Sequence, residues 1–283
     1  DVAVTGTPIS IGLSNVPSTV LGRWRVKSMD SPALFSTNKI LVTLRDSTNT
    51  TFDLYVNDTN TSGDVYCSAV GSFTNSGLTP GSPLRSIQAV LDAYNLGGGD
   101  TIYVDTGDYK GTNATFLVLR SDQGTQDRYL KIIGSTNAIA GGSILDRVSA
   151  TEDGIRVESR FVELQNLTIH TASKGVYVRD AQNNRFYNIL ARNCAVGFNG
   201  TGTATSNLFA GCVAMNNTIG VGDFGPGNAW DRGVSWSNGT AFSLSTLSSM
   251  SVSNSMIAGN TAFAASGVPA GDYNVLWQTL LTS

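Results

Sequence analysis

The sequence predicts an all-β solenoid, in which every coil contributes three short strands that lie parallel to those of the next coil. A small residue followed by an apolar residue recurs every 21 to 23 residues, at Gly154-Ile155, Gly175-Val176, Gly197-Phe198, Gly220-Val221, Ala241-Phe242 and Ala262-Phe263. A second marker keeps nearly the same period, at Thr171, Asn193, Asn216, Asn238 and Asn260. A period near 22 is too short for a pair of helices, which needs about 34 residues, and is typical of a coil of three strands.

The recurring asparagine predicts a structural ladder along the solenoid. Stacked coils place Asn193, Asn216, Asn238 and Asn260 above one another, where each side-chain amide can bond the amide of the next coil. We therefore expect these side chains to be buried and to stabilise turns, in preference to binding a ligand.

The chain divides into two predicted parts. Residues 1–65 form a small N-terminal β module, because strand-like alternation recurs between turn-rich stretches at 18–26, 39–44 and 52–56. Residues 66–283 form the solenoid.

One helix is predicted over residues 82–95, placed to cover the open end of the first coil. It is indicated by apolar residues at helical spacing, namely Ile87, Val90, Leu91 and Tyr94. The later coils predict one continuous interior that includes Ile155, Val157, Leu164, Leu167, Ile169, Val176, Val178, Ile189, Val213, Ile219 and Leu244.

Together these features resemble the right-handed parallel β-helix superfamily, the pectin-lyase-like solenoids. The resemblance rests on the asparagine ladder, the small-apolar pairs, the helix with the strand-like segments after it, and the closing segment 272–277. It implies a right-handed parallel β-helix with an N-terminal capping helix. It implies no single activity, because these solenoids include lyases, hydrolases, epimerases, adhesins and structural proteins.

Composition and charge narrow the expected partners. Of the 283 residues, 41% are apolar and 14% are charged, and the net charge of −3 is spread without clusters of like charge. Neither nucleic acid nor an anionic membrane surface is therefore an expected partner, and no stretch approaches the roughly 18 apolar residues of a membrane span. The chain starts with Asp1 and has no basic and apolar leader, which predicts a processed protein that is secreted or held at the cell surface.

Acidic residues align with basic residues one coil further along the chain. The three pairs are Asp153 with Lys174, Glu158 with Arg179, and Glu163 with Arg185. Opposite charges about one strand spacing apart, ~4.8 Å, commonly decorate a solvated sheet, so the first interpretation of these pairs is structural.

His170, the single histidine, is the best candidate for catalysis. It aligns with Arg192 one coil on, and a neighbouring cation favours the neutral imidazole that can accept a proton. Together with Lys174 and Arg179, these residues are the candidates for a polysaccharide lyase; the alternative is that a lone surface histidine has no role. The aspartate triad of hydrolases and the calcium-and-arginine pattern of lyases, which the resemblance would imply, have no counterpart here.

A calcium loop is one of two interpretations for a short polar run. The run provides side-chain oxygens at alternate positions, from Asp58, Asn60, Ser62 and Asp64. Its twelfth position, where a bidentate Glu is expected, is Ala69, and the run is equally typical of a turn rich in Asx hydrogen bonds. No cofactor other than calcium is expected.

The segment 221–233 predicts a loop that interrupts the rhythm of the coils. It contains Phe224, Trp230, Asp231 and Arg232, which combine aromatic rings with both signs of charge, as glycan-binding surfaces do. The alternative is an ordinary excursion that packs on the solenoid.

Two functions of different classes are consistent with these features. The first is a non-catalytic extracellular structural or adhesive protein that joins copies of itself head to tail into a filament or surface layer. It is indicated by the nearly uncharged last coils, 242–277, and by the segment 1–12, which is able to add to a neighbour as a strand. The alternative is a polysaccharide-active enzyme of the lyase type, or a glycan-binding β-helix.

Overall fold

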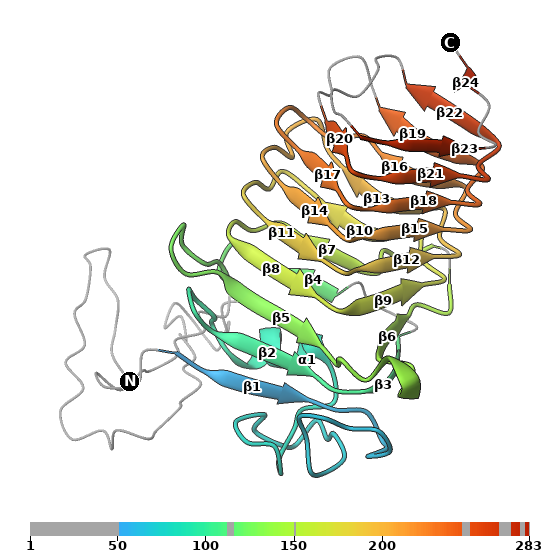
Figure 1. Ribbon diagram of the computed structural model, residues 1–283. Coiled ribbons are helices and arrows are strands. Elements are labelled where there is room, and N and C mark those ends of the chain that lie inside the picture. The colour runs from blue at the N-terminus through green and yellow to red at the C-terminus, as the bar shows by residue number, and fades with distance from the viewer. Residues whose placement is uncertain are drawn as a thin grey trace, which may run out of the picture.

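Three parallel β-sheets run side by side along one axis and enclose the interior of the molecule (Figure 1). The structure, a computed structural model, describes residues 51–111, 116–149, 151–244, 250–265, 273–277 and 281–282. In this part of the chain each sheet has eight strands, and each strand pairs in parallel with its counterparts in neighbouring coils. The parallel solenoid predicted from the repeat is thereby confirmed.

The three sheets are named A, B and C here. Sheet A consists of β1 (Asp53–Val56), β2 (Thr101–Val104), β5 (Leu130–Gly134), β8 (Val162–Gln165), β11 (Arg185–Tyr187), β14 (Leu208–Ala210), β17 (Ala229–Asp231) and β20 (Ser251–Ser253). Sheet B consists of β3 (Gly107–Lys110), β6 (Ser143–Asp146), β9 (Leu167–His170), β12 (Leu190–Arg192), β15 (Val213–Met215), β18 (Val234–Trp236), β21 (Met256–Ala258) and β23 (Val275–Trp277). Sheet C consists of β4 (Phe116–Val118), β7 (Ile155–Val157), β10 (Lys174–Val178), β13 (Val196–Gly200), β16 (Ile219–Gly222), β19 (Thr240–Leu244), β22 (Ala262–Ala265) and β24 (Leu281–Thr282).

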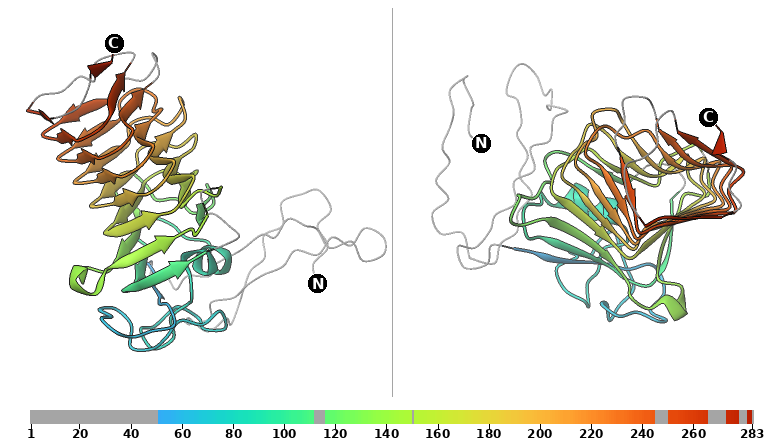
Figure 2. Two further views of the ribbon diagram at one scale, coloured as in Figure 1. Left: turned by 90° about the vertical axis from the view of Figure 1, so that its right-hand side faces the viewer. Right: turned by 45° about the horizontal axis from the view of Figure 1, so that its top comes forward.

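Single residues in the left-handed conformation form the corners on either side of sheet B. Asn166 precedes β9 and Thr171 follows it, with φ of 54° and 56°, and Asn188 and Asn193 take the same places around β12. Asn is favoured there because its short polar side chain tolerates positive φ. These tight corners let the coils stack closely over one another, as the right-hand view of Figure 2 shows.

An asparagine ladder exists, but two of its predicted members, Asn193 and Asn216, do not belong to it. Both are exposed corner residues with φ of 54°. The buried ladder consists of Asn217, Asn238 and Asn260, in which each Nδ2 donates to Oδ1 of the next coil over 3.0 Å. The prediction lost the register because strands β16 and β19 pair at a separation of 21 residues, so a step of 22 moves from the corner to the ladder.

A second buried ladder, formed by Asn184, Asn207 and Asn228, was not predicted. Its Nδ2 groups donate to Oδ1 of the next coil over 3.1 and 2.9 Å. These residues lie in the turns that lead into sheet A, where coil lengths vary. Each ladder satisfies amide groups that would otherwise be buried without partners.

Helix α1 (Ile87–Ala93) packs against the first strands of sheets A and C, namely β1, β2 and β4. It is shorter than the predicted helix 82–95, because Ser86 begins it by accepting the N–H of Ala89 on its Oγ over 3.1 Å. A 3₁₀ helix (Ala138–Ala140) lies between β5 and β6. Among the described residues no helix is both long enough and apolar enough to cross a membrane.

The interior is one apolar core in which aromatic rings of successive coils stack. The rings of Phe186 and Phe209 lie parallel with their centroids 4.5 Å apart, and Trp230 continues the stack at 6.1 Å from Phe209. Nine of the eleven predicted interior residues are buried. Val213 and Ile219 were wrong: both are half-buried on the outer face, because the alternation of their strands turns the next residue inward.

Most of the predicted N-terminal module lies outside the described residues. This holds for the strands at 18–26 and 39–44 and for the segment 1–12, which was expected to join a neighbouring copy. The third predicted strand is β1, which pairs with β2 along its whole length and is therefore the first strand of sheet A.

Candidate functional site

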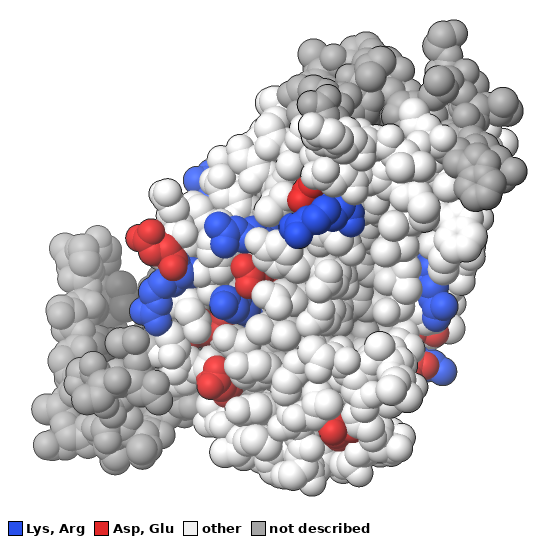
Figure 3. Space-filling view, viewed as in Figure 1, with Lys and Arg blue, Asp and Glu red and all other residues white. Residues whose placement is uncertain are grey.

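Four ionisable side chains form a column on the outer face of sheet B, one on each of the successive strands β3, β6, β9 and β12. In the strand register Lys110 pairs with Asp146, Asp146 with His170, and His170 with Arg192. Neighbouring strands are about 4.8 Å apart, so adjacent members of the column can interact directly. At the right-hand edge of Figure 3, blue and red atoms gather over these strands, whereas the later strands of sheet B are white.

His170 is held by the carboxylate of the preceding coil. Its Nδ1 lies 3.4 Å from Oδ1 of Asp146 and 3.0 Å from Oγ1 of Thr171. A carboxylate at Nδ1 favours the tautomer with the proton on that nitrogen, which leaves the lone pair on Nε2. Asp146 is itself positioned, because its Oδ1 accepts the N–H of Val148 over 2.9 Å. The imidazole is therefore oriented as a base.

Arg192 supplies a cation on the other side of the histidine. Its Nε is buried and has no hydrogen-bond partner among the described residues. A guanidinium with free N–H groups can bind a carboxylate and stabilise negative charge that develops on it. The predicted alignment of His170 with Arg192 is confirmed by the strand register.

Beyond Arg192 the column becomes apolar, with Met215 on β15 and Trp236 on β18. Trp236 is 49% exposed, and its indole lies against Gly259, where a Cβ atom would stand 3.0 Å from Nε1. An exposed indole provides a flat apolar surface on which a sugar ring can stack. The polar part of the column is thus continuous with an aromatic platform.

The other two predicted catalytic candidates, Lys174 and Arg179, lie elsewhere. They flank the two ends of β10 in sheet C, and each is already paired. Nζ of Lys174 is 3.5 Å from Asp153, and Nη1 of Arg179 is 3.3 Å from Glu158. The three predicted charge pairs are confirmed, since Arg185 also lies 3.9 Å from Glu163. Because Lys174 and Arg179 are on another sheet and neutralised, the structure does not join them to His170.

The predicted calcium loop uses its oxygens in local hydrogen bonds. Oδ1 of Asp58 accepts the N–H of Asn60 over 2.7 Å, and Oδ1 of Asn60 accepts that of Ser62 over 3.0 Å, as in successive Asx turns. In Asp64, Oδ2 accepts Nδ2 of Asn57 over 2.6 Å, while Oδ1 is buried without a partner. Burial raises the pKa of Asp64. The described residues hold no cluster of three His, Cys, Asp or Glu side chains, and calcium here stays a prediction.

The predicted aromatic binding loop was wrong for its two rings. Phe224 and Trp230 are fully buried in the core, where their centroids lie 5.0 and 6.1 Å from that of Phe209. The segment follows the coil path through β17, so the rings fill the interior that the turn encloses. Asp231 and Arg232 remain at the surface and pair with each other over 2.9 Å.

The sequence analysis missed Asp146 and Lys110. The repeat predicts neighbours about 22 residues apart, but Asp146 precedes His170 by 24 residues and follows Lys110 by 36. The early coils carry long turns, so the period is absent where these residues lie. A search for acidic residues at variable distances before His170 would have included Asp146.

Comparison with known proteins agrees with this architecture. No family model matches the chain. Pectate lyase PEL9 of Emericella nidulans is 30% identical over 156 residues, which are 51% of this chain and 37% of that protein. The chain therefore matches well under half the length of this curated relative.

Three solved structures are similar to most of the chain. Pectate lyase Pel9A has a TM-score of 0.60 at 17% identity, over 77% of this chain and 57% of that one. A rhamnogalacturonan lyase has a TM-score of 0.59 at 15% identity, over 81% of this chain and 74% of that one. An alginate lyase from Paenibacillus sp. has a TM-score of 0.57 at 14% identity, over 67% of this chain and 72% of that one. With its three parallel sheets, the chain has the right-handed parallel β-helix fold of the pectin-lyase-like superfamily.

Proposed function

We propose that the protein is a polysaccharide lyase that cleaves a polymer of uronic acids on the outer face of sheet B. The observation that carries the proposal is the arrangement of Asp146, His170 and Arg192 on three successive coils. It combines an oriented base with a free guanidinium, and the exposed platform of Trp236 continues the same column.

The chemistry is a β-elimination. Nε2 of His170 takes the proton from C5, the carbon next to the uronate carboxylate, and the electron pair forms the C4–C5 double bond. The C4–O glycosidic bond breaks, and the leaving oxygen takes a proton from water. Arg192 binds the carboxylate, where negative charge develops as C5 loses its proton, and Asp146 holds the imidazole in position.

The relatives support this reading in preference to a structural one. Those compared above are named as lyases of pectate, rhamnogalacturonan or alginate, and nothing in the comparisons supports a filament or surface layer. The proposal also places the protein outside the cell or at its surface, where such polymers are accessible.

The test is incubation with pectate, rhamnogalacturonan and alginate while the absorbance of the unsaturated product is followed. His170→Ala is expected to lower kcat by about 10²- to 10⁴-fold, because the base is lost. Lys131→Gln, on sheet A, is the matched control and is expected to retain the activity of the parent. An inactive parent on all three polymers, or a fully active His170→Ala variant, would contradict the proposal.

A further inference from the structure

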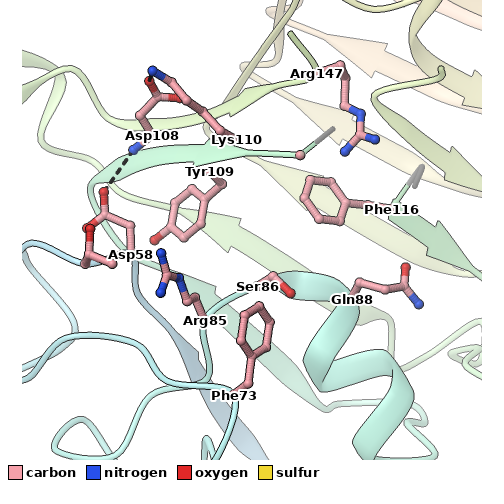
Figure 4. A pocket seen from close by; sticks show the side chains of 12 residues that line it. Asp58, Phe73, Arg85, Ser86, Gln88, Asp108, Tyr109, Lys110, Phe116 and Arg147 are labelled. Carbon is pink, nitrogen blue, oxygen red and sulfur yellow. Dashed lines mark hydrogen bonds and ion pairs between the residues drawn. The ribbon is translucent and has the colours of Figure 1, made fainter. Parts of the chain in front are cut away.

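A cavity of about 420 Å³ lies at the N-terminal end of the solenoid, beside the column on sheet B (Figure 4). Its walls come from the turn after β1, the start of α1, strand β3, the start of β4 and the residue that follows β6. Lys110 belongs both to this wall and to the column, where it is the strand neighbour of Asp146. The cavity is therefore continuous in register with the candidate active site.

Arg147 is the unusual member of the wall. It is only 1% exposed, and neither its Nε nor its Nη2 has a hydrogen-bond partner among the described residues. Its guanidinium stands 5.3 Å above the ring of Phe116, and a Cβ atom on Gly111 would collide with Nη1. Figure 4 shows the side chain directed toward the cavity. A buried guanidinium without a partner is costly, so an anion is expected to complete the site.

The remaining polar groups of the wall already have partners. Oγ of Ser86 caps α1, Oε1 of Gln88 accepts the N–H of Leu117 over 2.9 Å, and the hydroxyl of Tyr109 donates to the carbonyl of Asp105 over 2.9 Å. The structure itself does not need these groups to bind a ligand. Arg147 is different, because its free edge has no such use.

The charge of the wall suits an anion. Three cations, Arg85, Lys110 and Arg147, face two carboxylates, Asp58 and Asp108. Both carboxylates are occupied: Asp108 pairs with Lys110 over 3.2 Å, and Asp58 accepts the N–H of Asp108 over 3.2 Å. The net positive charge that remains lies at the buried guanidinium.

We propose that this cavity binds the carboxylate of a uronic-acid unit, with Arg147 as its bidentate anchor. Nε and Nη2 form one edge of the guanidinium, and two parallel N–H groups match the two oxygens of a carboxylate. Phe73, which is 68% exposed, and Phe116 provide apolar faces for the sugar ring. The choice of a uronate rests on the proposed function, whereas the anion site rests on Arg147 alone.

The test is calorimetric titration of the full chain with galacturonate, with short oligogalacturonates, and with galactose as the neutral control. The parent is expected to bind the acidic sugars and not galactose. Arg147→Lys keeps the charge but loses the bidentate edge, and is expected to weaken binding about ten- to a hundredfold. Gly111→Ala is expected to do the same by displacing the guanidinium, while Arg160→Lys, at an exposed turn, is expected to bind as the parent does.

A separate measurement distinguishes a binding role from a structural one. Arg147→Met, without ligand, is expected to melt at the temperature of the parent or above, since the variant removes an unpaired buried charge. A marked fall in melting temperature would show that Arg147 is structural and would overturn the proposal. So would a parent that binds no acidic sugar, or an Arg147→Lys variant that binds it as well as the parent, whatever the lyase assay gives. Binding that is lost in Arg147→Lys supports the site even when no polymer is cleaved.

Discussion

Asp122 links protonation to the stability of the first coils. It is buried, and burial raises its pKa to about 6, although the N–H of Leu96, 2.9 Å from Oδ1, and the hydroxyl of Ser121 favour the ionised form. The carboxyl group has a pKa of about 3.8 when exposed to water. The folded state therefore binds this proton more tightly than the unfolded state does.

We expect the contribution of Asp122 to stability to be complete below about pH 4 and to be lost as the pH rises through about 6. Two pKa units correspond to ~3 kcal/mol in the free energy of unfolding. Asp122→Asn keeps the neutral shape, so between pH 4 and 7 the variant is expected to become more stable relative to the parent by up to about that amount. Urea unfolding of both proteins across this range measures it, with the exposed Asp127→Asn as control. A constant difference between variant and parent would rule out the coupling.

At the scale of elements, the asparagine ladder and the left-handed corners have separate roles, although they are adjacent in sequence. Asn238 donates to Oδ1 of Asn260 and to the carbonyl of Ala214, both over 3.0 Å, and its Oδ1 accepts the N–H of Asn217 over 2.9 Å. Asn216, at the corner, is exposed. Burial makes the ladder amide the more costly group to remove.

Asn238→Ala is expected to lower the free energy of unfolding by ~1 to 3 kcal/mol or more, because it leaves buried groups of neighbouring coils without partners. Asn216→Gly is the control: glycine accepts the left-handed conformation, so the corner is expected to keep the stability of the parent within about 0.5 kcal/mol. Chemical denaturation measures both variants. Equal losses would mean that the two positions have been assigned the wrong way round.

At the scale of the whole molecule, the solenoid arranges its outer face along one axis. Ionisable side chains occupy the early strands of sheet B, and Met215 and Trp236 follow on later strands in the same column. From Lys110 to Trp236 the column crosses six strands, or about 24 Å at ~4.8 Å per strand. A bound polymer would therefore contact the catalytic and aromatic parts together, whereas a short oligomer would not reach both.

Trp236→Ala is accordingly expected to raise KM severalfold for long polymers, with little change in kcat or in KM for short oligomers. Steady-state kinetics on a polymer and on its dimer or trimer measure the contrast. If KM rose equally for both lengths, the platform would not be an extended part of the binding surface.

The sequence by itself determined the architecture and the contacts within regular coils. Gly175 and Gly220 recur because a Cβ atom would lie 2.6 Å from a backbone oxygen of the next coil, so the period reports the closeness of stacked turns. Where coils have constant length, spacing in the chain is the same as position in space. For this reason the alignment of His170 with Arg192 could be predicted.

Only the tertiary structure decided which residues complete the site and which way side chains face. Asp146 and Lys110 meet His170 through coils of irregular length, and the cavity around Arg147 joins four separate segments. Trp230 was expected at the surface, yet it lies in the core, because a shift of one residue along a strand turns a side chain to the opposite face. Such one-residue differences are invisible in a period that itself varies by two residues, and they decide burial and chemistry.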